Sequence, residues 1–93
     1  MQSKEEVLKE LEEAKRRLEL VKTKVRAEIQ VLTAAMDLNA DREIEKSFER
    51  LEELVGKGKY YGEPSTWSTL LGLIRHINNL QASLQRLESI KST

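Results

Sequence analysis

The 93-residue sequence contains no cysteine, a single histidine and a single proline, and the shortage of metal-binding side chains excludes several kinds of site. Without cysteine, the chain can form neither a disulfide framework nor a thiolate metal site. Because His76 is the only histidine, one chain cannot supply the two histidines that many transition-metal sites use. We therefore expect no metal and no other cofactor.

An excess of charge of either sign is also missing. Sixteen Lys and Arg residues balance sixteen Asp and Glu residues, so the chain has no net charge that would attract nucleic acid or an anionic membrane. No apolar run approaches the roughly 20 residues that span a bilayer. Residues 1–6 lack the basic and apolar regions of a signal peptide. These absences predict a soluble, cytoplasmic protein without a membrane partner.

Motifs that support catalysis are absent as well. The sequence has no G-x-G-x-x-G fingerprint, Walker loop or nucleophile elbow, and the glycines between residues 56 and 62 do not lie between a strand and a helix, as those of a phosphate loop do. No acid, base and nucleophile are brought together by their spacing. The prediction is that the protein is not an enzyme.

What the sequence does contain is apolar periodicity of the kind that forms helices. Ser3 and Glu6 have the spacing of a capping box, which starts a helix predicted over about residues 3–37. Its apolar stripe has the three- and four-residue steps of a coiled-coil seam, with one slipped step expected after Val25. The stripe consists of Val7, Leu11, Ala14, Leu18, Val21 and Val25, followed by Ile29, Leu32 and Met36.

Two further helices follow. A short helix is predicted over about residues 41–56, because it carries an apolar stripe and ends at a glycine. Residues 57–64 contain glycine and the only proline and form the longest loop. A third helix is predicted over about residues 65–91, and between Ser65 and Gln85 its only fixed charge is Arg75. A helix with so few charges is readily buried, so we expect it to be the central element.

These elements predict one all-α domain over residues 1–93. Its fold would be a three-helix antiparallel bundle, with long, coiled-coil-like first and third helices and a short second helix. At about 1.5 Å per residue the helices measure roughly 50, 24 and 40 Å. A short second helix cannot cover the seams of the two longer helices, and apolar surface left in water costs about 25 cal/mol per Å². We therefore expect dimerisation to complete the bundle.

The expected association surface is the seam of the first and third helices. Gln81 falls among the apolar positions of the third helix, and one polar residue in a seam can fix the register and the oligomeric state. The partner would be the protein itself, as a homodimer or higher oligomer, or an amphipathic helix of another protein. The predicted seam residues are Val7, Leu11, Leu18, Leu73, Ile77, Leu80, Gln81, Leu84 and Leu87.

Aromatic and histidine residues offer two other candidate sites. Tyr60, Tyr61 and Trp67 surround the long loop, where they either form a small recognition patch or plug the open end of the bundle. His76 shares a helical stripe with small polar residues. It is interpreted as a solvated or rim histidine in preference to part of a polar interface.

We therefore hypothesise a non-enzymatic helical module for protein–protein interaction or self-association. One alternative is an engineered or designed bundle that serves as a scaffold or binder, because residues 4–19 follow idealised helix design in propensity, pattern and charge. A second alternative is a small nucleic-acid-associated regulator that uses the basic cluster between Lys15 and Arg26. No aromatic residue is interleaved with that cluster for base stacking, which argues against nucleic acid as a partner.

Overall fold

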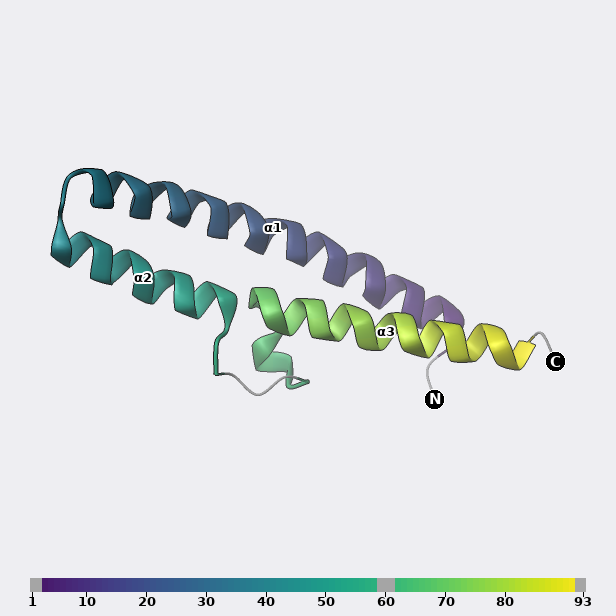
Figure 1. Ribbon diagram of the computed structural model, residues 1–93. Coiled ribbons are helices and arrows are strands. Elements are labelled where there is room, and N and C mark those ends of the chain that lie inside the picture. The colour runs from purple at the N-terminus through teal and green to yellow at the C-terminus, as the bar shows by residue number, and fades with distance from the viewer. Residues whose placement is uncertain (1–2, 59–61, 92–93) are drawn as a thin grey trace.

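A computed structural model describes residues 3–58 and 62–91, which form three α-helices and one short 3-10 helix. The helices are α1 (Lys4–Asp37), α2 (Asp41–Val55) and α3 (Leu70–Lys91), and the 3-10 helix η1 (Pro64–Thr66) precedes α3. Both α2 and α3 run antiparallel to α1 (Figure 1). The predicted all-α fold, with long first and third helices and a short second one, is confirmed. Within the described ranges no helix is long and apolar enough to cross a membrane.

The two shorter helices lie in series along the one long helix. Helix α2 covers the C-terminal half of α1 and α3 covers its N-terminal half, whereas α2 and α3 have few contacts with each other (Figure 1). The molecule is a rod of 62 × 21 × 16 Å. Its radius of gyration is 17.4 Å, against about 12 Å for a compact domain of this length. The expectation that the N-terminal seam of α1 is left uncovered is therefore wrong, because α3 packs on it.

The hydrophobic core is a single seam between α1 and α3. Val7 and Leu73 are almost completely buried, and the other members, together with the partly buried Leu18, follow them at alternating steps of four and three residues on each helix. A seam of this kind is one layer of side chains thick, because only two helices meet at any level of the rod. The buried apolar residues of the seam are Val7, Leu11, Ala14, Val21, Leu73, Ile77 and Leu80.

On α1 the seam continues toward α2 without the predicted slip. The buried positions after Val21 are Glu28 and Ala35, each a heptad further on, whereas Ile29 and Met36 are exposed. A carboxylate can occupy the seam here because α2 compensates it. Arg50 forms an ion pair with the Glu28 side chain, and the buried Ser47 hydroxyl donates to the Glu28 carbonyl at 3.3 Å. The stutter inferred from hydrophobicity alone is wrong for this reason.

Local capping interactions fix the first two helices. The Ser3 hydroxyl accepts a hydrogen bond from the Glu6 amide at 3.2 Å, as the capping-box spacing predicted. Between α1 and α2, Asn39 has a φ of 54°, a left-handed conformation that asparagine adopts more readily than most residues. Helix α2 ends at Gly56, whose φ is 87°. The chain therefore turns sharply at residues 38–40 and places α2 back along α1.

Helix α3 begins at Leu70, later than the predicted residue 65. Residues 64–66 form η1 instead, and the Thr66 hydroxyl donates to the Glu63 carbonyl at 2.7 Å. The buried Thr69 hydroxyl accepts from the Gly72 amide at 3.1 Å and donates to the Thr66 carbonyl at 2.8 Å. Thr69 therefore caps α3.

Candidate interaction surface

The residues predicted to form an association seam contact one another within a single chain. Val7, Leu11, Leu73, Ile77 and Leu80 are buried between α1 and α3, and Leu18, Leu84 and Leu87 are partly buried against them. Gln81 lies outside this seam and is exposed, because the seam of α3 passes through Leu80 and Leu84 instead. Gln81 is therefore not part of the seam within one chain, and its register-fixing role in an oligomer stays a prediction. The chain's own helices already occupy the remaining seam positions.

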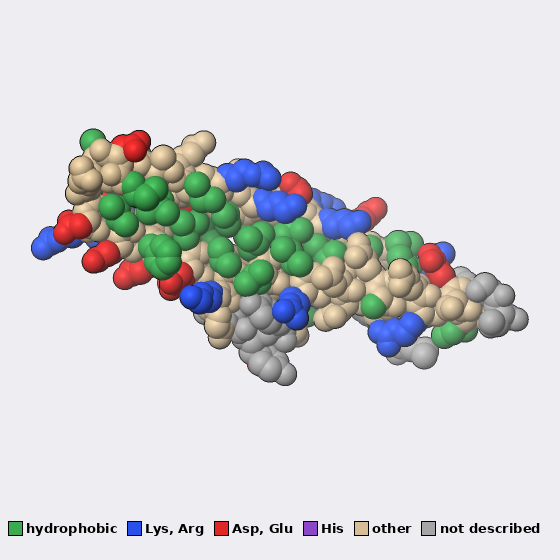
Figure 2. Space-filling view, in the orientation of Figure 1, with side chains coloured by type: hydrophobic (Ala, Val, Ile, Leu, Met, Phe, Trp, Pro, Cys, Tyr) green, Lys and Arg blue, Asp and Glu red, His purple; other side chains and the backbone are tan. Residues whose placement is uncertain are grey.

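Exposed apolar side chains gather instead on one side of the α1–α2 hairpin. Ile29 is 47% exposed, Met36 50% and Phe48 54%. Each of them directly follows a buried residue, and in an antiparallel helix pair such positions lie on the same side. Half-buried neighbours extend this surface. We define the hairpin face as Val25, Ile29, Leu32, Met36, Ile44, Phe48, Leu51 and Val55. Figure 2 shows hydrophobic side chains spread over α1 and α2 on one face of the rod.

The opposite side of the hairpin combines charged and apolar residues. It carries an open groove of about 620 Å³ between α1, α2 and the residues that precede α3. The ion pair of Glu28 and Arg50 lies there, together with Lys24 and Glu53. Val31, which is 45% exposed, is on this side and not on the hairpin face. The two sides of the same helix pair therefore present different chemistry.

Charged residues of opposite sign border the hairpin face along its two long edges. Arg26 precedes Ile29 by three residues and lies along the α1 edge, and Lys22, seven residues before Ile29, lies at the end of the apolar stripe beside that edge. Glu45 and Glu52 lie three residues before and four after Phe48, along the α2 edge. Figure 2 shows basic side chains beside the apolar surface over α1 and acidic ones along α2. The hairpin face thus has a basic edge and an acidic edge.

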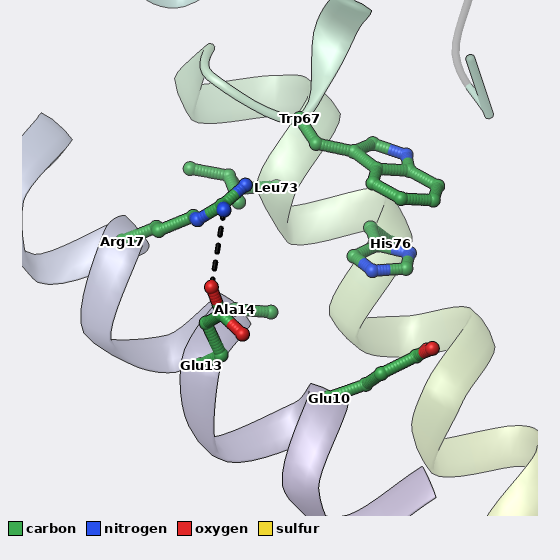
Figure 3. A pocket seen from close by; sticks show the side chains of 7 residues that line it. All are labelled: Glu10, Glu13, Ala14, Arg17, Trp67, Leu73 and His76. Carbon is green, nitrogen blue, oxygen red and sulfur yellow. Dashed lines mark hydrogen bonds and ion pairs between the residues drawn. The ribbon is translucent and has the colours of Figure 1, made fainter. Parts of the chain in front are cut away.

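A second candidate site is a pocket of about 210 Å³ between α1 and α3. It is lined in part by Trp67, one of the residues of the predicted aromatic patch. The indole of Trp67 stacks on the imidazole of His76, with ring centroids 3.8 Å apart and planes 12° apart. Figure 3 shows this stack, with Glu10 extending from α1 toward α3. Arg17 donates to Glu13 at 3.1 Å. Trp67 also packs against the core, and its buried Nε1 has no acceptor among the described residues.

This packing favours the interpretation of Trp67 as a plug over that of a recognition patch. Its ring is partly buried against the α1–α3 core, on the same pocket as Ala14 and Leu73, and is not presented to solvent as a whole. Tyr60 and Tyr61, the other two members of the predicted patch, lie outside the described residues. His76, interpreted from the sequence as a solvated or rim residue, is half-buried under the indole.

Burial lowers the pKa of His76 below its usual 6.5, and the nearby Arg17 guanidinium contributes in the same direction while the Glu10 carboxylate opposes it. A lowered pKa in the folded state means that the unfolded chain binds the proton more tightly. The contribution of neutral His76 to stability is therefore fully present above pH 6.5. It is lost as the pH falls from 6.5 through the lower pKa of the folded protein.

We expect wild-type protein to lose stability between pH 7.5 and 5.5, and His76→Phe to lose less. Phenylalanine keeps the stack on Trp67 but cannot be protonated, so the proton-linked part of the loss disappears. Urea unfolding followed by circular dichroism at the two pH values measures the difference. Equal losses in both proteins would show that His76 binds protons equally well folded and unfolded.

Not all residues of the predicted basic cluster lie on the same side of α1. Lys24 and Arg17 line the two pockets described above, whereas Lys22 and Arg26 border the hairpin face. Arg17 pairs with Glu13 and Lys22 pairs with Glu19 at 3.4 Å. These four cationic groups thus lie on different sides of α1, and two of them are paired within the chain. Nucleic-acid binding by the cluster stays a prediction.

Similarity to other proteins gives no guide to the role of these surfaces. No protein-family model matches the sequence, and neither a curated protein nor a solved structure is significantly similar to it. Over residues 3–58 and 62–91, no three His, Cys, Asp or Glu side chains are grouped so that they could hold a metal ion. The function must therefore be argued from the surface itself.

Proposed function

We propose that the protein is a non-enzymatic helical module that binds other helices through the hairpin face. The observation that supports this function is the gathering of Ile29, Met36 and Phe48, each about half exposed, on one side of a helix pair. Leaving them in water costs about 25 cal/mol for every Å² of apolar surface, and contiguous patches of this kind mark interaction sites in soluble proteins.

The shape and composition of the hairpin face favour a helical partner. Two helices packed side by side form a shallow groove into which the apolar side chains of another helix can pack. Within α2 the apolar residues Ile44, Leu51 and Val55 are partly buried against the chain, whereas Phe48 is 54% exposed and is available to a partner. A second pair of helices laid on the face would produce a four-helix bundle, which buries such stripes on all sides.

A photo-crosslinking experiment tests this function. The photoreactive amino acid benzoylphenylalanine replaces Phe48 on the hairpin face and, as the matched control, Glu53 on the opposite side of the same helix. In cells that express each variant, we expect covalent adducts to protein from position 48, with the attached peptide identified by mass spectrometry, and far fewer from position 53. Equal yields at the two positions, or none at 48, would contradict the proposed function.

A further inference from the structure

We propose that the occupant of the hairpin face is the hairpin face of a second copy of this chain, related by a two-fold axis parallel to the helices. This inference rests on the proposed function and specifies its partner. In this arrangement α1 of one copy lies over α2 of the other. The four helices form a bundle in which each helix is antiparallel to both of its neighbours.

The charges at the edges of the hairpin face select this orientation. An axis parallel to the helices sets the basic edge of one copy, with Lys22 and Arg26, against the acidic edge of the other, with Glu45 and Glu52. An axis perpendicular to the helices sets the basic edges against each other and the acidic edges against each other. Like charges opposed across an interface disfavour a pairing, whereas complementary edges favour it.

Three of the four edge residues are available for pairing with a second copy, whereas Lys22 already pairs with Glu19. Among the described residues, Arg26, Glu45 and Glu52 form no ion pair within the chain, and the ion pair that joins α1 to α2, Glu28 with Arg50, lies on the other side. The pairing of the acidic residues of α2 with the basic residues of α1 is therefore not satisfied on this face by one chain alone.

The register of the hairpin gives the proposed interface specific contacts. Glu28 contacts both Ser47 and Arg50, so Ile29 and Phe48 lie at nearly the same level of the rod. Rotation about an axis parallel to the helices preserves that level. Phe48 of one copy therefore lies over Ile29 of the other, and Glu52 lies beside the other copy's Arg26, at the next turn.

Two matched substitutions on α1 test whether the face self-associates. Ile29 and Val31 are 47% and 45% exposed but lie on opposite sides of the hairpin. We expect sedimentation equilibrium to show wild-type dimers, and Ile29→Asp to raise the dissociation constant about 100-fold or more, because an unpaired charge would be buried. Val31→Asp should change it less than about threefold. Circular dichroism must show that both variants keep the helix content of the wild type.

Disulfide trapping tests the orientation. Because the chain has no cysteine, single Ile29→Cys and Phe48→Cys variants give unambiguous bonds. An oxidised equimolar mixture should give a dimer linked from residue 29 to residue 48, since these positions face each other across the proposed interface. Either variant alone should give little linked dimer. Efficient 29-to-29 or 48-to-48 linkage would overturn the parallel axis.

The failures of the two proposals are distinguishable. Wild-type protein that sediments as a single chain at high micromolar concentration overturns self-association. If residue 48 then crosslinks to a different, identified protein, the proposed function stands and only the identity of the partner is wrong. If residue 48 also gives no adduct, both proposals fail. Equal weakening by Ile29→Asp and Val31→Asp would overturn the hairpin face as the dimer interface.

Discussion

Replacing Leu73 with alanine is expected to lower the free energy of unfolding by about 2–5 kcal/mol, which is the usual cost of truncating a fully buried leucine. The Leu73 side chain has 0% exposure, at the centre of the seam between α1 and α3. The core is one layer thick, so few neighbours can move to fill the cavity. Because small domains are stable by only about 5–15 kcal/mol, this loss is a large fraction of the total.

Chemical denaturation measures the effect, with Leu20→Ala as the control. Leu20 is 63% exposed on α1, and the same truncation there should change the free energy of unfolding by no more than about 0.5 kcal/mol. A similar small change at both positions would mean that α3 does not pack on α1 through Leu73.

Gly72→Ala is expected to destabilise the protein by about 2 kcal/mol or more, although alanine favours helix by about 1 kcal/mol relative to glycine. A Cβ atom at residue 72 would lie 1.8 Å from the Thr66 carbonyl oxygen and 2.7 Å from the Thr69 hydroxyl. Both contacts are far inside normal separations. The substitution would therefore displace the turn that caps α3.

The exchange in the opposite direction provides the control. Ala82 is exposed on the same helix, and Ala82→Gly should cost about 1 kcal/mol through helix propensity alone. The expected result is that glycine is preferred at 72 and alanine at 82, as measured by the midpoint of thermal unfolding. A higher midpoint for Gly72→Ala would show that the turn accommodates a methyl group.

The helices were predictable because local signals define them. Ser3 and Glu6 fix the start of α1, glycine ends α2, and the leucines of α3 repeat at helical spacing. The start of α3 was not predictable from capping residues alone, because several residues between 65 and 69 are good helix caps. The choice of Thr69 depends on the close approach of Gly72 to Thr66, which is a tertiary contact.

The candidate surface was missed because hydrophobicity alone placed Ile29 and Met36 in the seam. Their neighbours Glu28 and Ala35 are less hydrophobic, yet they hold the buried positions. The signal that identifies them is the unbroken heptad from Val7, which reaches residues 28 and 35 without a slip. An acidic seam position is credible only when Arg50 is known to lie opposite, and the sequence does not give that pairing.

The end-to-end arrangement of α2 and α3 along α1 could not be predicted from the sequence either. Three helices of unequal length can pack side by side as a bundle, or the two shorter helices can lie one after the other along the longest. Here the 15 residues of α2 and the 22 of α3 together nearly match the 34 of α1. The unequal helix lengths therefore do not leave the ends of the seam exposed, because α2 and α3 together cover α1. The exposed apolar surface lies along one side of the rod.

Because α2 and α3 have few contacts with each other, α1 is the element that connects the two halves of the rod. Each half has its own partner helix, and the central turns of α1 are the main structural connection between them. Separating α2 from α1 would leave the seam from Val7 to Leu73 intact, so the hairpin half can open while the other half stays folded. We therefore expect the two ends of the rod to differ in how readily they unfold.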